Sequence, residues 1–119
     1  MTENGSNPRY QTLRGEFVKS LSEKYIADFL YLHQVQYEYE HPLFLDGQMI
    51  KPDFYLPSYD TYIEFWGILE DPNYYHSFKW KVEKYKAHNI RFIALQLEDL
   101  PALEKNFEIK LKTALGTSQ

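Results

Sequence analysis

Cysteine is absent from the 119-residue chain, which excludes disulfides, thiolate nucleophiles and cysteine-ligated zinc sites. Histidine is scarce as well. None of the four histidines has another at the close spacing of a metal-binding motif: His33, His41, His76 and His88. A metal site in this chain would therefore use oxygen ligands, which favours magnesium or manganese.

Long hydrophobic runs are also missing. No window approaches the roughly 18 uninterrupted apolar residues of a membrane span, and the polar start from Met1 to Arg9 lacks the apolar core of a signal peptide. We therefore expect a cytoplasmic protein with no membrane association. The formal net charge of -4 does not by itself indicate a polyanionic partner.

Aromatic residues are abundant, at 18% of a chain that is 44% hydrophobic, so we expect a packed globule. The length suits one domain with one core. Residues 1–15 mix Asn, Gly, Ser, Thr and Pro without periodicity. We therefore expect a flexible N-terminal segment over 1–15 and a single domain over 16–119.

The first half of that domain predicts one helix and three strands. Ser20-Leu21-Ser22-Glu23 has capping-box spacing, and apolar residues follow at helical spacing, so a helix is expected over 20–34. Val35 to His41 alternates as a half-buried strand does. After a turn at Asp46-Gly47, two strands over 49–56 and 61–66 flank a Pro-Ser-Tyr-Asp turn, which completes an antiparallel meander.

The second half predicts a helix, a strand and a last helix. Asp71-Pro72-Asn73 begins a helix that ends near His88-Asn89, and 90–97 is a nearly continuous apolar run, typical of an interior strand. Asp99 with Pro101 begins the last helix, which has one apolar side. The expected class is α/β, with an α-β-β-β-α-β core, a C-terminal helix and a mixed central sheet.

The central hairpin contains an unusual pair of acids. A symmetric turn places Leu56 opposite Thr61 and Asp53 opposite Glu64. Directly opposed Cβ atoms lie about 5 Å apart, and like charges at that distance destabilise the pair unless a cation or a shared proton lies between them. The other face of the hairpin is apolar and is expected to face the core: Ile50, Phe54, Leu56, Ile63 and Phe65.

Pro52-Asp53, followed after a short gap by Glu64-x-Trp66 and preceded by a helix with Glu23, resembles the PD-(D/E)XK nuclease superfamily. With Tyr74, Lys81 and Tyr85 included, the chain is similar to small nuclease domains that occur alone or attached to UvrD-type DNA helicases. The resemblance covers roughly residues 18 to 100. It implies a restriction-endonuclease-like fold, whose core has the same element order.

The resemblance also implies a metal site. Asp53, Glu64 and the backbone carbonyl of Phe65 would bind Mg2+, with Mn2+ as an alternative, and the ion would activate water for attack on a DNA phosphodiester. Glu23 would be an accessory acid. The family's lysine is replaced by Trp66, but several branches take this lysine from the following helix.

The helical phase selects among the lysines of that helix. With Tyr74 at zero, Tyr85 falls near about 20° and Lys81 near about 340°, whereas Lys84 and Lys79 fall near about 280° and 140°. Lys81 therefore borders the packed face, and we expect it to be the catalytic lysine. The remaining cations of this region would contact DNA phosphates: Lys79, Lys84, Lys86 and Arg91.

Each site residue also has a purely structural interpretation. Asp53 could be a turn residue after Pro52. Glu64 could form a salt bridge with Lys51 or Lys81, and Glu23 is explained by the capping box. The lysines could be the solvated face of an amphipathic helix.

The expected function is that of a metal-dependent deoxyribonuclease in DNA repair, recombination or defence. The alternative is a non-catalytic nuclease-like module that binds nucleic acid or a partner such as a helicase or another repair protein. Neither the preferred DNA structure nor the choice between endonuclease and exonuclease follows from the sequence. The small size is compatible with a homodimer.

Overall fold

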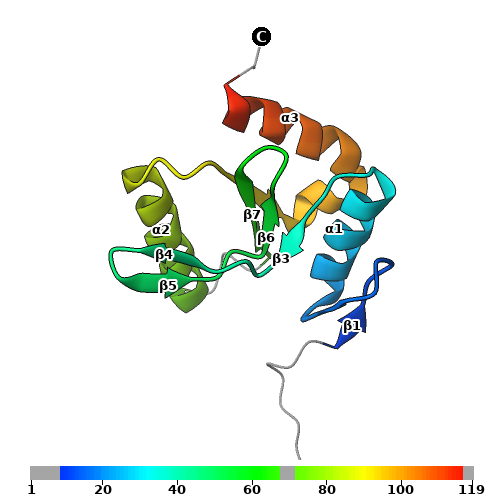
Figure 1. The fold of residues 1–119 in the computed structure, drawn as a ribbon, viewed down its shortest axis with the longest axis horizontal. Coiled ribbons are helices and arrows are strands. Elements are labelled where there is room, and N and C mark those ends of the chain that lie inside the picture. Colours follow the sequence, from blue (N-terminus) through cyan, green and yellow to red (C-terminus); the bar gives the residue numbers. More distant parts are fainter. Residues whose placement is uncertain (1–8, 68–71, 117–119) are drawn as a thin grey trace, which may run out of the picture.

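The computed structural model describes residues 9–67 and 72–116, which form an α/β domain with three α-helices (Figure 1). The elements in chain order are β1 (Tyr10–Gln11), β2 (Phe17–Val18), α1 (Leu21–Leu32), β3 (Glu38–Tyr39), β4 (Leu43–Leu45), β5 (Gln48–Ile50), β6 (Phe54–Leu56), β7 (Thr61–Trp66), α2 (Pro72–Ala87), β8 (Phe92–Gln96), the 3₁₀ helix η1 (Leu97–Ala102) and α3 (Leu103–Leu115). None of the helices in these ranges is long and apolar enough to cross a membrane.

The central sheet has four strands in the order β3-β6-β7-β8. The first two pairings are antiparallel, and β7 pairs with β8 in parallel, so the predicted mixed sheet is confirmed. The strand at 92–96 lies at the edge of this sheet, not in its interior as its apolar run predicted. Its apolar residues are explained by burial on both faces, because Ile93 lies in the main core and Phe92 packs on Tyr85 of α2.

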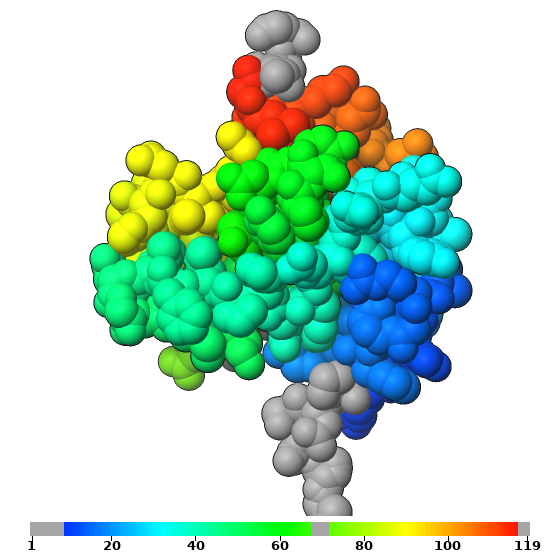
Figure 2. All heavy atoms as spheres, viewed as in Figure 1, coloured from blue at the N-terminus to red at the C-terminus, as the bar shows by residue number. Residues whose placement is uncertain are grey.

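Helices cover both faces of the sheet. On one face, α1 and α3 contribute Ile26, Leu30, Leu103 and Phe107 to the main core. On the other face lies α2, together with the β4–β5 hairpin (Figure 1). In the space-filling view the hairpin lies on the surface of the molecule, in front of α2 (Figure 2). This arrangement explains why five of the six residues of β7 are buried.

The predicted strand over 49–56 is divided in two. Its first part is β5, which pairs with β4, and its second part is β6, which pairs with β7. Pro52 lies between them and has no N–H to donate to a ladder. Ile50 therefore belongs to a separate cluster with Leu45 and Tyr85, and its predicted place in the main core is wrong. The predicted turn at Asp46-Gly47 is confirmed, with φ of 52° and 75° as a two-residue hairpin turn requires.

The N-terminal segment is more ordered than its composition predicted. Tyr10–Gln11 pairs with Phe17–Val18 in a short hairpin. The hairpin is tied to the rest of the domain through Glu16, whose carboxylate accepts from the Tyr37 hydroxyl at 2.5 Å. Residues 10 and 11 of the segment predicted to be flexible therefore form a short strand, and residues 1–8 lie outside the described part of the chain.

The helix boundaries largely follow their predicted signals. The Ser20 side chain accepts from the Glu23 N–H, as a helix N-cap does, and α1 begins at Leu21. Asp71, predicted at the start of the second helix, lies outside the described residues, and α2 runs from Pro72 to Ala87. Asp99 begins no α-helix, because its carboxylate accepts from the Gln96 N–H at 2.8 Å and caps the 3₁₀ helix instead. The predicted apolar side of the last helix is confirmed by the burial of Leu103, Phe107 and Leu111.

Candidate carboxylate site

The register of β6 and β7 is the predicted one. Leu56 pairs with Thr61 and Phe54 with Ile63, so the next position in the same register sets Asp53 opposite Glu64. Glu64 lies in the middle of β7 and is only 2% exposed. Asp53 precedes β6 and is partly exposed. The two acids therefore meet at the start of β6, beside the middle of β7.

The Asp53 side chain replaces a backbone hydrogen-bond acceptor of the sheet. The Phe65 N–H donates to Asp53 Oδ2 at 2.6 Å. If the ladder between β6 and β7 continued, a backbone carbonyl would accept this bond instead. The other carboxylate oxygen of Asp53 accepts no hydrogen bond from the described residues. Among the described residues, the Phe65 carbonyl accepts only one long bond, 3.3 Å, from the Tyr74 hydroxyl. Two oxygen atoms with spare capacity thus lie beside Glu64.

Glu64 is held from α2. The Tyr85 hydroxyl donates to Glu64 Oε2 at 2.5 Å, and Lys81 Nζ lies 3.4 Å from Glu64 Oε1. Tyr85 and Lys81 are four residues apart and therefore share one face of the helix. The structure brings Lys81 to the acids, which is the position that the helical phase predicted. The Glu64–Lys81 ion pair is also the one that the structural interpretation of Glu64 predicted, so the contact fits both roles.

Lys81 has three neighbours in the site. Besides Glu64, its ammonium lies 3.4 Å from the Lys51 carbonyl and 5.6 Å from the centroid of the Trp66 ring. The Trp66 ring packs against Phe78 at 4.3 Å between centroids. Its Nε1 is buried and has no hydrogen-bond partner among the described residues. The Trp66 ring therefore lies beside Lys81. In the family's pattern a lysine would stand at position 66 itself.

Glu23 faces the same site from the start of α1. It is 8% exposed, and its Oε1 accepts from the Lys19 N–H at 3.0 Å and from the Tyr39 hydroxyl at 2.8 Å. Only half of the predicted capping box forms, because Glu23 bonds the residue before Ser20 and not Ser20 itself. The carboxylate thus caps the entry to α1 and also lies at the wall of the site.

These groups line a hollow of about 450 Å³. Its wall is built from the N-terminal end of α1, the ends of β6 and β7, and one face of α2. The lining residues are Ser20, Ser22, Glu23, Asp53, Glu64, Phe65, Trp66, Gly67, Tyr74, Ser77, Lys81 and Leu97. Three carboxylates and one lysine therefore face one small space.

Burial makes the charged forms of these acids unfavourable. The pKa of Asp53 is raised well above its usual range, first by burial and then by the charges of Glu64 and Glu23. The pKa of Glu64 is also raised by burial, although Lys81 and the Tyr85 hydroxyl act in the opposite direction. A divalent cation between the acids would relieve this cost, because an adjacent positive charge favours the charged form of a carboxylate.

The donor set fits a hard cation. Mg2+ and Mn2+ prefer oxygen ligands, and the site offers the spare oxygen of Asp53, the carboxylate of Glu64 and the carbonyl of Phe65. No group of three or more His, Asp or Glu side chains is arranged as a metal site within 9–67 and 72–116. The cation would therefore be held by two side chains and one backbone carbonyl, with water or substrate completing its coordination.

The predicted DNA-binding cations do not form a continuous surface. Lys84 pairs with Asp46 at 2.8 Å, and Arg91 donates to the Tyr59 carbonyl at 2.8 Å. These two residues hold the β4–β5 turn and the β6–β7 turn in place. Lys79 and Lys86 are exposed on α2. They are the two residues of the predicted set that remain available for phosphates.

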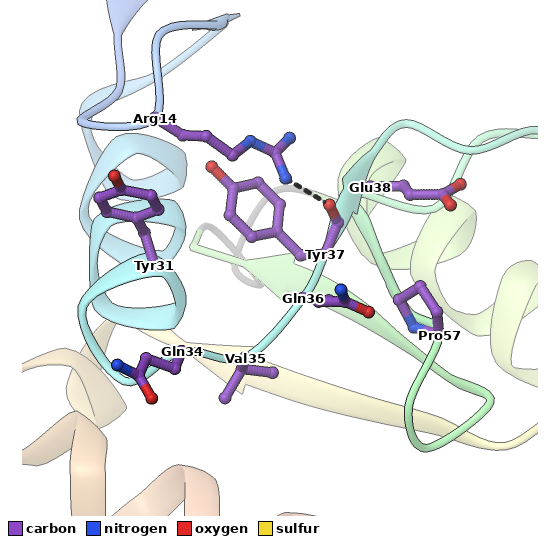
Figure 3. Close-up of a pocket in the computed structure, with 8 residues that line it drawn as sticks. All are labelled: Arg14, Tyr31, Gln34, Val35, Gln36, Tyr37, Glu38 and Pro57. Atoms are coloured by element: carbon purple, nitrogen blue, oxygen red, sulfur yellow. Dashed lines mark hydrogen bonds between the residues drawn. The ribbon is translucent and has the colours of Figure 1, made fainter.

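A second hollow, of about 550 Å³, lies at the other end of α1 (Figure 3). Arg14 is the one cation among its described lining residues. It lies 3.7 Å from the centroid of the Tyr37 ring and donates to the Tyr37 carbonyl at 2.6 Å. The Nε and Nη2 atoms of its guanidinium donate to the two carboxylate oxygens of Glu16. With Arg14 fully engaged, this hollow lacks a pair of acids and a free cation, so we do not assign it a catalytic role.

Two features of the site are not evident from the sequence. Tyr85 was assigned to the apolar stripe of its helix, yet its hydroxyl is the shortest contact of Glu64. The spacing of Tyr85 could have indicated this contact, because a tyrosine four residues after a lysine lies on the same face of the helix. No sequence signal predicted the bond from the Phe65 N–H to Asp53, because this bond depends on where β6 begins.

The raised pKa of Asp53 predicts a pH-dependent gain in stability for Asp53→Asn. Because the folded state binds this proton more tightly than the unfolded state, the free energy of unfolding of the wild type falls as pH rises above about 4, the usual value of an aspartate. Without added metal, the variant should therefore have the higher urea midpoint at pH 7 but not at pH 4. A tenfold change in proton affinity corresponds to about 1.4 kcal/mol.

The control for this experiment is Glu83→Gln, which removes an exposed acid from α2. It should leave the wild-type midpoint nearly unchanged at both pH values. An equal difference between Asp53→Asn and wild type at pH 4 and pH 7 would show that burial of the charge is not the cause.

Comparison of the chain with protein-family models, with curated proteins and with solved structures gave no match.

Proposed function

We propose that this protein is a magnesium-dependent deoxyribonuclease of the PD-(D/E)XK type. One observation carries the proposal: two opposed acids with raised pKa values and a lysine from a separate helix line one hollow. A purely structural ion pair would need only one acid. The second acid costs stability unless a cation binds, and this cost is expected at functional sites.

Each group has a distinct role in this proposal. Asp53, Glu64 and the Phe65 carbonyl would hold the ion. When bound, the ion would lower the pKa of a water molecule and offset the charge that develops on the phosphate. Tyr85 keeps one oxygen of Glu64 fixed and so orients the other. Lys81, beside that other oxygen, would bind a phosphate oxygen and orient the attacking water.

The substrate would be recognised through its backbone. Lys79 and Lys86 are exposed on the helix that carries Lys81, and they would contact DNA phosphates. Such recognition suits an enzyme of DNA repair, recombination or defence. Glu23 would act as an accessory acid from α1, on the opposite wall of the hollow.

A panel of labelled DNA substrates tests this function. Duplex, single-stranded, forked and flapped DNA are incubated with the protein and Mg2+ or Mn2+, and the products are separated by size. We expect cleavage of at least one substrate that stops when the metal is chelated. The absence of cleavage with either metal on all four substrates would contradict the proposal.

A non-catalytic module is the second candidate, and one observation favours it. Glu64 already has a cationic partner and a hydroxyl donor, so each of its carboxylate oxygens has a partner without a metal. Calorimetric titration with Mg2+ or Mn2+ distinguishes the two. Binding that is lost in both Asp53→Ala and Glu64→Ala supports the nuclease, whereas no metal binding supports the module. The module would bind nucleic acid, a helicase or another repair protein.

A further inference from the structure

A third hollow opens beside the carboxylate site. It has a volume of about 440 Å³ and is lined by Leu21, Ser22, Tyr25, Leu97, Leu100 and Pro101. Ser22 and Leu97 also line the carboxylate site, so the two hollows adjoin each other. We call this third hollow the side groove. It runs between α1 and η1, and anything bound there would lie directly next to the proposed reaction centre.

The lining of the side groove is apolar and aromatic. None of its six residues is charged. Three of its large side chains are exposed: Leu21 at 63%, Leu97 at 55% and Tyr25 at 50%. A phosphate would find no cation here, but the flat face of a base could pack on the Tyr25 ring and the leucine side chains. The chemistry of the wall therefore matches bases and not the DNA backbone.

The far end of the side groove limits what it can hold. Tyr25 and Pro101 also line a fourth hollow, whose ionisable residues are His33, Glu104, Lys105 and Glu108. Two carboxylates against one lysine would repel a phosphate backbone. A DNA strand in the side groove would therefore turn away before this point, so the groove holds a short segment only.

We infer that the side groove binds an unpaired nucleotide next to the phosphodiester that is cleaved. The inference rests on the proposed function and narrows its substrate to DNA with a single-stranded segment at the cleavage point. In a duplex the bases are stacked inside and the phosphates face outward, so an uncharged wall gains nothing. An unpaired base can leave the stack and rest on Tyr25, a contact worth about 1–3 kcal/mol.

Binding is measured first. The protein carries Asp53→Asn so that it does not cut, and the probe is a fluorescein-labelled thymidine 12-mer in the presence of Mg2+, followed by anisotropy. Adding Tyr25→Ala should weaken binding about 5- to 150-fold, the range that the stacking energy gives, while Tyr25→Phe should change it less than about twofold. Tyr31→Ala is the matched control, because Tyr31 is 47% exposed on the same helix but lies outside the side groove.

Cleavage is measured second, with substrates that lack one base. The nucleotide on either side of the cleaved bond is replaced in turn by an abasic sugar in a single-stranded substrate. At one of the two positions the wild type should lose as much activity as Tyr25→Ala loses on the intact strand. Combining the abasic substrate with Tyr25→Ala should cause no further loss, because the same contact is removed twice.

The outcomes separate this inference from the proposed function. If no DNA is cut but single-strand binding depends on Tyr25, the nuclease proposal fails and the side groove stands as a base-binding site. If cleavage requires Asp53 and Glu64 but Tyr25→Ala leaves single-strand binding and cleavage unchanged, the nuclease stands and the inference is overturned. Equal losses on single-stranded and blunt duplex DNA would also overturn it.

Discussion

Glu64→Gln should lower the cleavage rate on the order of 10³-fold or more while leaving the fold intact. Glutamine keeps the shape of Glu64 and can still accept from the Tyr85 hydroxyl, but it removes the negative charge that would hold the metal. Asp53→Asn should lower the rate by a similar factor, because it also removes a negative charge that would hold the metal. It should leave the fold intact, because the amide oxygen can still accept from the Phe65 N–H. Initial rates at saturating Mg2+ and circular dichroism spectra of both variants check these results.

Stability separates this prediction from the structural interpretation. If Glu64 served only as a salt-bridge partner of Lys81, its replacement would mainly destabilise the fold, because removal of one partner of a buried pair costs about 3–5 kcal/mol. If the acids form a metal site, the neutral variants should unfold at equal or higher urea concentration than the wild type without metal. A variant that retains wild-type cleavage and loses stability would contradict the proposed site.

The register of the site was predictable because it depends on local signals. The Pro-Ser-Tyr-Asp turn and the period-two alternation around it determine which residues of the two strands face one another. That is sufficient to set Asp53 opposite Glu64. Lys81 was predictable for a similar reason, since the phase of a regular helix follows from its apolar residues.

The rest depended on contacts between segments far apart in the sequence. The predicted strand over 49–56 is interrupted because residues 48–50 pair with β4 on the surface of α2, an alternative that alternation alone does not distinguish. Asp53 became a hydrogen-bond acceptor for Phe65 only because of that interruption. The bonds of Glu23 to Lys19 and Tyr39 likewise require the β3 strand to pass beside the start of α1.

Lys81→Met should lower the cleavage rate about 10²- to 10³-fold, the usual effect of removing one donor that stabilises charge in a transition state. Methionine retains much of the side-chain volume over the Trp66 ring. Metal affinity, measured by calorimetry, should change much less than the rate. Lys84→Met is the matched control, because it removes a lysine one turn away that pairs with Asp46 outside the site. A larger loss from Lys84→Met would mean that the wrong face of α2 was assigned to the site.

Trp66→Lys should restore part of the activity of Lys81→Met. Side chains two apart on a strand share a face, so a lysine at position 66 would start from the same face as Glu64 and the same hollow. It would also cost stability, because Trp66 packs on Phe78, so rates must be compared well below the unfolding midpoint.

Trp66→Met in the same background controls for the loss of the ring and should restore nothing. Recovery with lysine alone would show that the cation itself is what the site requires, since the helix and the strand would then supply the same group from different positions. If the folded double variant gave no recovery, the charge at Lys81 would not act on the substrate in the way proposed.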